Sequence, residues 1–366
     1  MKIKRTVGVL LILFYLTLIV YIKTPVIAYE DESFLTCTFF DVGQGDAALL
    51  SCDGYNMLSD GGGDETGWQL VEQLKALGVS KLNYVVLTHA HRDHAGGLAA
   101  VAESFPIKSA LVPCFTVPYD APTYDRYVSA LEAQGTFLMA PKPGTTFRLG
   151  GAECTVLAPA SADWVTISDE ANNTSLVIRV TYGSTSFLFT GDAEWIEEEE
   201  LLQSGYFLGS DVLKVGHHGS VRSSTEAFIS AVHPAVAVVS VGADNEYGHP
   251  DDTVIQRIQA YADVLRTDIN GSVMVISDGQ TITVSAQRGY EGNSFASQTK
   301  GGYITEVTMA PEIHRYILNT RESSMKFHLP NCPSVNDISE RNKQEYEGTR
   351  EDLIEMGYSP CGYCRP

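Results

Sequence analysis

Four residues that can bind a metal ion lie within six positions of the chain, in the segment His89-Ala90-His91-Arg92-Asp93-His94. Imidazole and carboxylate groups suit Zn²⁺ and Mn²⁺. A lone histidine is most often a structural or surface residue, but three histidines and an aspartate at this spacing, followed by Gly96-Gly97, indicate a metal site. The apolar run Tyr84–Leu87 precedes the segment, so these ligands are expected to converge in a turn at the end of a strand.

Further candidate ligands follow strand-like runs later in the chain. Asp192 ends one run and is suited to bridging two cations, the paired His217 and His218 end the next, and His249 lies in a loop after a third. Of the nine histidines, six therefore stand at strand ends or in adjoining loops, which favours a site where they converge. The predicted metal ligands are His89, His91, Asp93, His94, Asp192, His217, His218 and His249.

Four other polar residues are candidates for supporting roles. Asp60, in Leu58–Gly62, is predicted to orient a ligand imidazole, with an ordinary turn aspartate as the alternative. Asn173, Ser220 and Arg222 are candidates to hold phosphate oxygens, with capping or surface roles as the alternative.

The elements that must position these residues follow from the spacing of apolar side chains. Phe34–Asp41 and Ala47–Cys52 read as strands joined by Gly43-Gln44-Gly45, and Trp68–Leu77 and Thr253–Tyr261 have helical spacing. Strand runs and strand–helix alternation coexist along the chain. The pattern predicts an α/β protein with two mixed sheets flanked by helices, rather than one doubly wound sheet.

The first residues predict export. Lys2, Lys4 and Arg5 precede the apolar run Val7–Ile22, and Val26-Ile27-Ala28 would serve as a small-residue cleavage site. Residues 1–28 are thus expected to be a signal peptide or a membrane anchor, with the basic end inside. Both alternatives predict an extracellular protein, secreted or anchored to the outer face of the cytoplasmic membrane.

Residues 287–310 are rich in Gly, Ser, Gln and Asn and are predicted to be a linker before a small module over residues 311–366. In that module His-x₃-Cys and Cys-x₂-Cys are zinc-knuckle spacings, and a Cys361–Cys364 disulfide is the alternative. The segment resembles the zinc-binding domain of the Ada DNA-repair protein, with a histidine in place of one cysteine, and is expected to be α+β. The predicted ligands of one structural Zn²⁺ are His328, Cys332, Cys361 and Cys364.

Six motifs together, in order, resemble the extracellular metallo-β-lactamase domain of ComEC-type competence proteins. They are Asp41–Ala47, His89–His94, Asn172–Ser175, Thr190–Asp192, Gly216–Ser220 and Tyr247–Pro250. The resemblance covers about residues 34–284 and implies an αββα sandwich over residues 33–286, with the metals between the edges of two sheets. It also implies hydrolysis of a phosphodiester, with DNA as the expected substrate.

Two divalent metals, Zn²⁺ or Mn²⁺, are expected in this domain. We expect metal one to take His89, His91 and Asp192, and metal two to take Asp93, His94 and Asp192 with His249 or one of the His217/His218 pair. A metal-bound hydroxide would attack phosphorus, and the non-ligating member of the pair would protonate the leaving oxygen. The expected catalytic residues are Asp93, Asp192, His217 and His218.

The sequence departs from the family in two ways. ComEC-type proteins carry a polytopic membrane channel, which this chain lacks. No histidine lies between His94 and His217, where many enzymes of this fold have a third ligand, and Asn172 or Asn173 stands near that position.

The net charge of −20 argues against broad, non-specific binding to nucleic acid, but divalent cations can make an acidic site attractive to phosphate. The leading hypothesis is an exported nuclease or phosphodiesterase. The alternatives are an esterase or lactonase acting on a cell-wall or small-molecule ester, and a non-catalytic metal-bearing binding protein. The expected partners are DNA or another phosphodiester, and the membrane if residues 1–28 remain attached; no protein partner is inferred.

Overall fold

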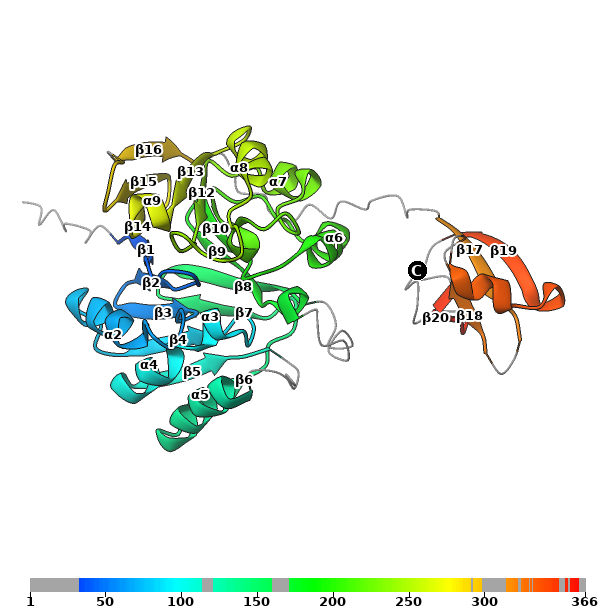
Figure 1. The fold of residues 1–366 in the computed structure, drawn as a ribbon, viewed down its shortest axis with the longest axis horizontal. Coiled ribbons are helices and arrows are strands. Elements are labelled where there is room, and N and C mark those ends of the chain that lie inside the picture. Colours follow the sequence, from blue (N-terminus) through cyan, green and yellow to red (C-terminus); the bar gives the residue numbers. More distant parts are fainter. Residues whose placement is uncertain are drawn as a thin grey trace, which may run out of the picture. The chain divides into compact units, whose positions relative to one another are not determined.

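The computed structural model describes residues 33–113, 121–159, 171–290, 292–297, 314–321, 324–328, 330, 332–348, 353–354 and 356–361. The chain divides into two compact units, residues 1–302 and 303–366 (Figure 1). The signal or anchor segment expected over residues 1–28 lies outside the described residues. Among the described residues, no helix has the length and apolar character needed to cross a membrane.

Two mixed β-sheets form the frame of the first unit (Figure 1). In its described part, the larger sheet has nine strands in the order β16-β15-β14-β1-β2-β3-β4-β5-β6. Their bounds are β1 (Leu35–Phe39), β2 (Ala48–Cys52), β3 (Tyr55–Ser59), β4 (Leu82–Val86), β5 (Ile107–Leu111), β6 (Phe137–Met139), β14 (Val273–Ser277), β15 (Thr281–Ala286) and β16 (Asn293–Ala296).

The smaller sheet has seven described strands in the order β13-β12-β11-β10-β9-β8-β7. Their bounds are β7 (Thr146–Leu149), β8 (Ala152–Ala158), β9 (Val177–Tyr182), β10 (Thr185–Phe189), β11 (Val212–Lys214), β12 (Val236–Val239) and β13 (Asp263–Arg266). Strands β3 to β6 of the larger sheet and β10 to β13 of the smaller sheet are parallel. Parallel neighbours end at the same edge of a sheet, so the loops that follow them are brought together.

The main core lies between the two sheets. Alternate residues of β1, Leu35, Cys37 and Phe39, point into it, as the period of a strand with one face on the core requires. From the other sheet, β10 contributes Phe187 and Phe189, and the rings of Phe39 and Phe189 are 5.9 Å apart. Burial of these apolar faces holds the two sheets against each other.

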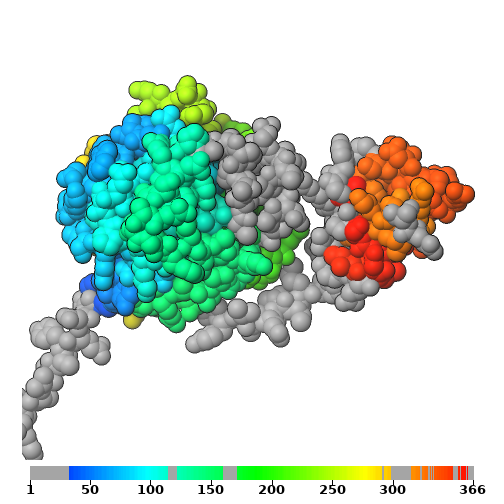
Figure 2. Space-filling view, turned by 90° about the horizontal axis from the view of Figure 1, so that it is seen from below, coloured from blue at the N-terminus to red at the C-terminus, as the bar shows by residue number. Residues whose placement is uncertain are grey.

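Helices cover both outer faces. The α-helices described in this unit are α2 (Gly67–Ala76), α3 (Arg92–Ala95), α4 (Leu98–Ser104), α5 (Ala121–Ala133), α6 (Trp195–Gln203), α7 (Glu226–Val232), α8 (Asp252–Gln259) and α9 (Thr267–Asn270). The first group, α2, α4 and α5, packs with the larger sheet, and α6, α7 and α8 pack with the smaller one. On the side of this unit that Figure 2 shows, most of the described surface belongs to the blue-to-green part of the chain, which comes first in the sequence. The unit is therefore the expected αββα sandwich.

The larger sheet extends further than the sequence suggested. Strand β16 pairs with β15 in antiparallel register, and Phe295 packs against the main core. The prediction of a linker over residues 287–310 is therefore wrong in its first part. The segment is rich in small polar residues, and the edge strand within it packs only one apolar side chain, Phe295, against the core, so its composition did not indicate a strand.

The second unit is described by itself. Its described residues form a four-stranded sheet in the order β19-β17-β18-β20, around a small core of Tyr316, Leu318, Phe327 and Leu353. The bounds are β17 (His314–Asn319), β18 (Lys326–His328), β19 (Lys343–Gly348) and β20 (Ser359–Pro360), with 3₁₀ turns η4 (Pro333–Asp337) and η5 (Glu340–Asn342). The charged stretch between Cys332 and Cys361 contains β19, which pairs with β17.

Helix α6 carries a buried acid that predicts a pH-dependent stability. Neither carboxylate oxygen of Glu197 has a hydrogen-bond partner among the described residues. Burial, with the nearby Glu200 carboxylate, raises the pKa of Glu197 well above its usual value. A raised folded-state pKa means that this residue destabilises the fold progressively as pH rises above about 4.5.

Glu197→Gln is therefore expected to raise the free energy of unfolding by about 1–3 kcal/mol at pH 8, and by much less at pH 4. Urea unfolding of wild type and variant at both pH values measures this. Glu199→Gln, on the exposed side of the same helix, is the matched control. An equal gain at both pH values would contradict the reasoning.

Candidate metal centre

The predicted ligands lie in loops that follow strands of both sheets. The loops are Asp41–Ala47 after β1, Asp60–Gly62 after β3, Thr88–His94 after β4, Thr190–Asp192 after β10, Gly216–Ser220 after β11 and Val241–Pro250 after β12. Two of them are in backbone contact, since Asp46 N donates to Asp93 O at 3.1 Å. A Cβ at Gly45 would lie 2.3 Å from Asp93 O, and its φ is +142°, so this close approach requires glycine.

Two groups of ligand atoms share one carboxylate. His89, His91 and Asp192 form one group, and Asp93, His94, Asp192 and His218 form the other. Within each group one atom of every residue lies within 4.8 Å of the others. The structure thus brings together six of the eight predicted ligands, and Asp192 belongs to both groups.

The donor set fits metal ions. His89, His94, Asp192 and His218 are all buried, and at most 2% of each is exposed. Asp192 Oδ1 has no hydrogen-bond partner in the part of the chain that the structure describes, and His94 Nε2 faces Asp192 Oδ2 at 3.3 Å without forming a hydrogen bond. Buried polar atoms are almost always paired, so two such atoms among converging imidazoles and carboxylates are suited to a cation.

Charges within the cluster favour ionised carboxylates. Burial alone would raise the pKa of Asp192, but the imidazoles of His218 and His94 outweigh it and hold that pKa well below its usual value. Burial lowers the pKa of His89, which favours the neutral ring that a metal needs. For His94 and His218 the surrounding aspartates overcome burial and raise the pKa well above its usual value.

Hydrogen bonds to their Nδ1 atoms orient the rings of His94 and His218. His94 Nδ1 lies 3.0 Å from Asp60 Oδ2, while Thr88 donates to Asp60 from its backbone N and its hydroxyl, each at 2.8 Å. His218 Nδ1 lies 2.9 Å from Ser240 O. Both rings therefore present Nε2 to the centre, and Asp60 lies where the sequence predicted an orienting residue.

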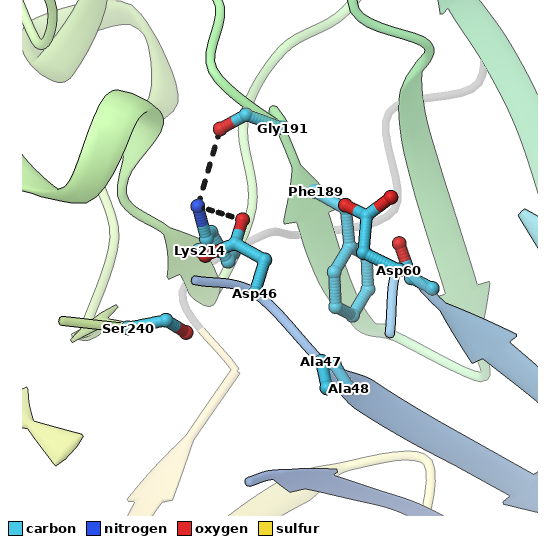
Figure 3. Close-up of a pocket in the computed structure, with 9 residues that line it drawn as sticks. Asp46, Ala47, Ala48, Asp60, Phe189, Gly191, Lys214 and Ser240 are labelled. Atoms are coloured by element: carbon cyan, nitrogen blue, oxygen red, sulfur yellow. Dashed lines mark hydrogen bonds and ion pairs between the residues drawn. The ribbon is translucent and has the colours of Figure 1, made fainter. Parts of the chain in front are cut away.

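An ion pair that the sequence analysis missed lies behind these rings. Lys214 at the end of β11 contacts Asp46 and donates to Gly191 O at 3.1 Å (Figure 3). Asp46 Oδ1 also lies 3.4 Å from His218 Nδ1. Burial alone would raise the pKa of Asp46, but Lys214 and His94 hold it below its usual value. Asp46, Gly191 and Lys214 line a cavity of about 10 Å³ together with Asp60 and Ser240, which is room for about one water.

His217 lies beside the two ligand groups rather than in them. Its Nδ1 is 3.1 Å from Glu194 Oε1, and its Nε2 is 4.0 Å from Asp192 Oδ2. Both His217 and His218 have positive φ, 45° and 52°, in the turn η3 (Gly216–Gly219). Because of this backbone conformation, the two adjacent rings point in different directions. The His218 ring lies in a ligand group, and the His217 side chain lies beside it and is 20% exposed.

His249 also lies outside both ligand groups. Its ring centroid is 5.3 Å from that of His217 and 6.5 Å from that of His218, and it stacks on Tyr247. The ligand atom that was expected from His249 or the His217/His218 pair is supplied by His218. The geometry does not place His249 among the ligands.

Two of the three candidate phosphate contacts are occupied within the protein. Asn173 Oδ1 accepts from the backbone N of Glu194 and of Glu197, at 3.2 Å each, so it caps the start of α6 instead. Ser220 is buried, and its Oγ accepts from Arg222 N at 3.3 Å. The Arg222 side chain is half exposed, although its Nη2 pairs with Glu194 Oε2 at 2.7 Å.

Glu194 was missed by the sequence analysis, although it links several of these residues. Its carboxylate contacts His217, Arg222 and the Nδ2 of Asn172 at 3.0 Å. Asn172 thus lies next to His217, near the position of the missing third histidine, and its Oδ1 is buried without a partner among the described residues. The indication in the sequence was that Glu194 is an acidic residue only two positions after the predicted ligand Asp192.

Comparison with known proteins agrees with this geometry. Residues 40–243 match the metallo-beta-lactamase superfamily. ComE operon protein 3 of Bacillus subtilis is 30% identical over 270 residues, covering 69% of this chain and 34% of that protein. Competence protein ComA of Neisseria gonorrhoeae is 32% identical over 247 residues (66% and 32%), and recombination protein 2 of Haemophilus influenzae is 34% identical over 242 residues (64% and 28%).

The chain spans about a third of the length of these curated relatives. The family match covers more than half of this chain and contains both ligand groups. The chain therefore belongs to the metallo-β-lactamase superfamily of metal-dependent hydrolases and is related to competence proteins.

Proposed function

We propose that this protein is an exported, metal-dependent phosphodiesterase that cleaves DNA. The observation that carries the proposal is the position of Asp192, whose carboxylate is shared by two groups of imidazole and carboxylate ligands. Two divalent cations at 3.5–4 Å spacing are typical of phosphatases and nucleases, where they activate water and stabilise the attacking and leaving oxygens.

Each residue has a defined task in this proposal. Two cations would be held by His89, His91, Asp93, His94 and His218, and Asp192 belongs to both ligand groups. Asp60 fixes the ring of His94. His217 is held by Glu194 on the exposed side of Asp192, where it can give a proton to the leaving oxygen. Arg222, fixed by the same glutamate, is available to a phosphate oxygen.

DNA is proposed as the substrate because relatives of this chain are named for competence and recombination. The net charge of −20 is compatible with this choice if the cations, rather than a basic surface, bind the phosphate. Export is proposed because Lys2, Lys4 and Arg5 precede the apolar run Val7–Ile22.

The test uses the chain without residues 1–28, loaded separately with Mn²⁺ and Zn²⁺. It is incubated with single- and double-stranded DNA and with bis-p-nitrophenyl phosphate, beside the Asp192→Ala variant. Cleavage of DNA that the variant lacks supports the nuclease and identifies the working metal. Turnover of the small diester alone would replace DNA with a smaller phosphodiester, and inertness toward all three would reject a phosphodiesterase in favour of an ester substrate or a binding role.

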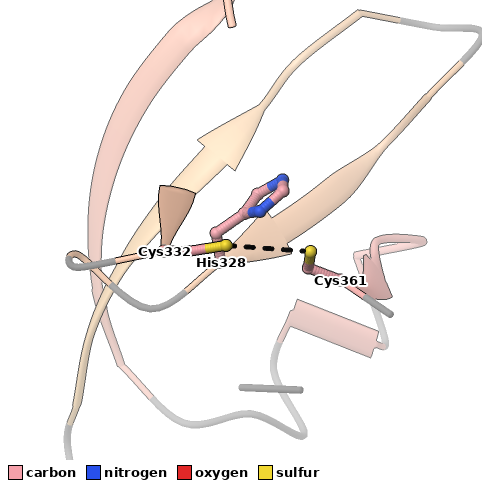
Figure 4. A group of neighbouring side chains, drawn as sticks. All are labelled: His328, Cys332 and Cys361. Carbon is pink, nitrogen blue, oxygen red and sulfur yellow. Dashed lines mark hydrogen bonds between the residues drawn. The ribbon is translucent and has the colours of Figure 1, made fainter. Parts of the chain in front are cut away.

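A structural zinc ion in the second unit is also part of the proposal. His328, Cys332 and Cys361 are buried and converge, with His328 Nδ1 lacking a partner among the described residues (Figure 4). The Cys332 and Cys361 sulfurs are 4.0 Å apart. This is about twice a disulfide bond length, but it suits two thiolates at about 2.3 Å from one zinc ion. Cys364, the proposed fourth ligand, lies outside the described residues.

Cys332→Ala is expected to reduce the zinc content by one ion per chain and to remove the unfolding transition of the second unit, because such small units fold on their metal. Metal analysis and calorimetry of the full chain measure both effects. The buried Cys154 of the first unit supplies the control variant, Cys154→Ala, which should keep the zinc count. An unchanged count in Cys332→Ala would exclude this zinc site.

A further inference from the structure

A row of ring contacts leads from the candidate metal centre to the surface. The Tyr247 ring lies on the His249 ring, with centroids 6.0 Å apart and 23° between the planes. His249 in turn contacts His217 edge-on at 5.3 Å, beside the ligand His218. Tyr247 is 63% exposed, so an aromatic face remains available at the end of this row. A single exposed tyrosine is common on protein surfaces, but ring contacts through His249 and His217 connect Tyr247 to the candidate metal centre.

Hydrogen bonds within the protein hold the loop that carries Tyr247 and His249. Asn245 Nδ2 donates to Gly242 O and His249 O, at 2.9 and 2.6 Å, and its Oδ1 accepts from the backbone N of Tyr247 and of His249. Gly242 N donates to Gln44 Oε1 at 3.1 Å, which ties the loop to the loop after β1. A ring already held in place loses little conformational entropy on binding, which favours its use as a contact surface.

The charge around Tyr247 restricts what it can bind. Its neighbours Asp244 and Glu246 are exposed acids, so this loop does not attract a phosphate group by itself. The face of the ring is what remains for recognition. Stacking on an aromatic side chain requires a planar group with a free face, and bases within a duplex are covered on both faces by their neighbours.

We propose that Tyr247, supported by His249, forms a subsite that stacks one unpaired nucleobase of a strand whose phosphate lies at the metal centre. The proposal rests on the proposed function and specifies its substrate as single-stranded nucleic acid. Base and phosphate are then recognised by separate parts of the site, the base by the ring of Tyr247 and the phosphate by the cations with Arg222. It also gives His249 a role, that of supporting the ring, which fits its place outside the ligand groups.

The test measures binding rather than turnover. The metal-loaded chain is titrated with a phosphorothioate-linked tetrathymidylate and with the same backbone carrying abasic tetrahydrofuran units. Tyr247→Ala is expected to weaken binding of the thymidylate about tenfold or more and to leave the abasic strand unaffected, whereas Tyr247→Phe keeps both. Phe137→Ala, which removes an equally exposed ring on β6, is the matched control and should change neither.

Equal weakening of both strands, no weakening, or failure of Tyr247→Phe to keep binding would overturn the subsite. So would a wild-type chain that binds neither strand. The proposed function is judged separately by DNA cleavage in the wild type. Cleavage with no effect of Tyr247→Ala rejects only the subsite, and base-dependent binding without cleavage rejects only the nuclease.

Discussion

Replacing Asp192 with alanine is expected to leave at most one metal ion in the first unit and to lower turnover more than a hundredfold. A loss of about 10–100-fold is usual for residues that only orient a metal ligand, and Asp192 is shared by both ligand groups. The variant also removes a buried carboxylate that lies 3.3 Å from His94 Nε2 and 3.4 Å from His218 Nε2, so both rings should lose part of their raised pKa. Metal analysis after dialysis, with turnover of bis-p-nitrophenyl phosphate, gives both quantities.

The control for this change is His249→Ala. His249 was a predicted ligand, but the structure leaves it outside both groups, so this variant should keep two ions in the first unit. Circular dichroism of both variants shows whether the fold is retained. Two ions in Asp192→Ala would exclude the shared carboxylate, and the loss of an ion in His249→Ala would restore His249 as a ligand.

The sequence was sufficient for most of this centre because its ligands occupy strand ends. A cluster such as His89–His94 converges whatever the exact pairing of the strands, and Asp192 ends a neighbouring run. The choice between His217 and His218 could not be predicted, since it depends on two successive residues with positive φ in η3. The outer position of His249 likewise depends on the hydrogen bonds of Asn245, which spacing does not reveal.

The elements that the sequence missed have weaker patterns. No helix was predicted over Ala121–Ala133 (α5), yet Tyr127 and Leu131 on it are completely buried against the larger sheet. Lys214 was also not identified in the sequence analysis as part of a buried ion pair. It is, however, the only charged residue in the run Val212–Val215, and a lysine in a buried parallel strand needs a partner, which Asp46 provides.

Lys214→Met is expected to lower the free energy of unfolding of the metal-free protein by about 3–5 kcal/mol at pH 7, because the buried Asp46 carboxylate loses its counter-charge. Methionine keeps most of the side-chain volume, so the loss reports charge rather than packing. Lys214 lowers the folded-state pKa of Asp46, and the stability gained from that shift is present at neutral pH and disappears as pH falls below about 4. The deficit of the variant should therefore shrink between pH 7 and pH 3.

A double-mutant cycle distinguishes this pair from a general defect. Asp46→Leu with Lys214→Met removes both charges and should cost less than Lys214→Met alone, as expected when no unpaired charge remains buried. The exposed pair Arg148 and Glu153, 3.1 Å apart, is the control, and Arg148→Met should cost no more than about 1 kcal/mol. If the double variant were as unstable as the sum of the single changes, the pair would contribute nothing as a pair. Asp46 and Lys214 would then act on the fold separately.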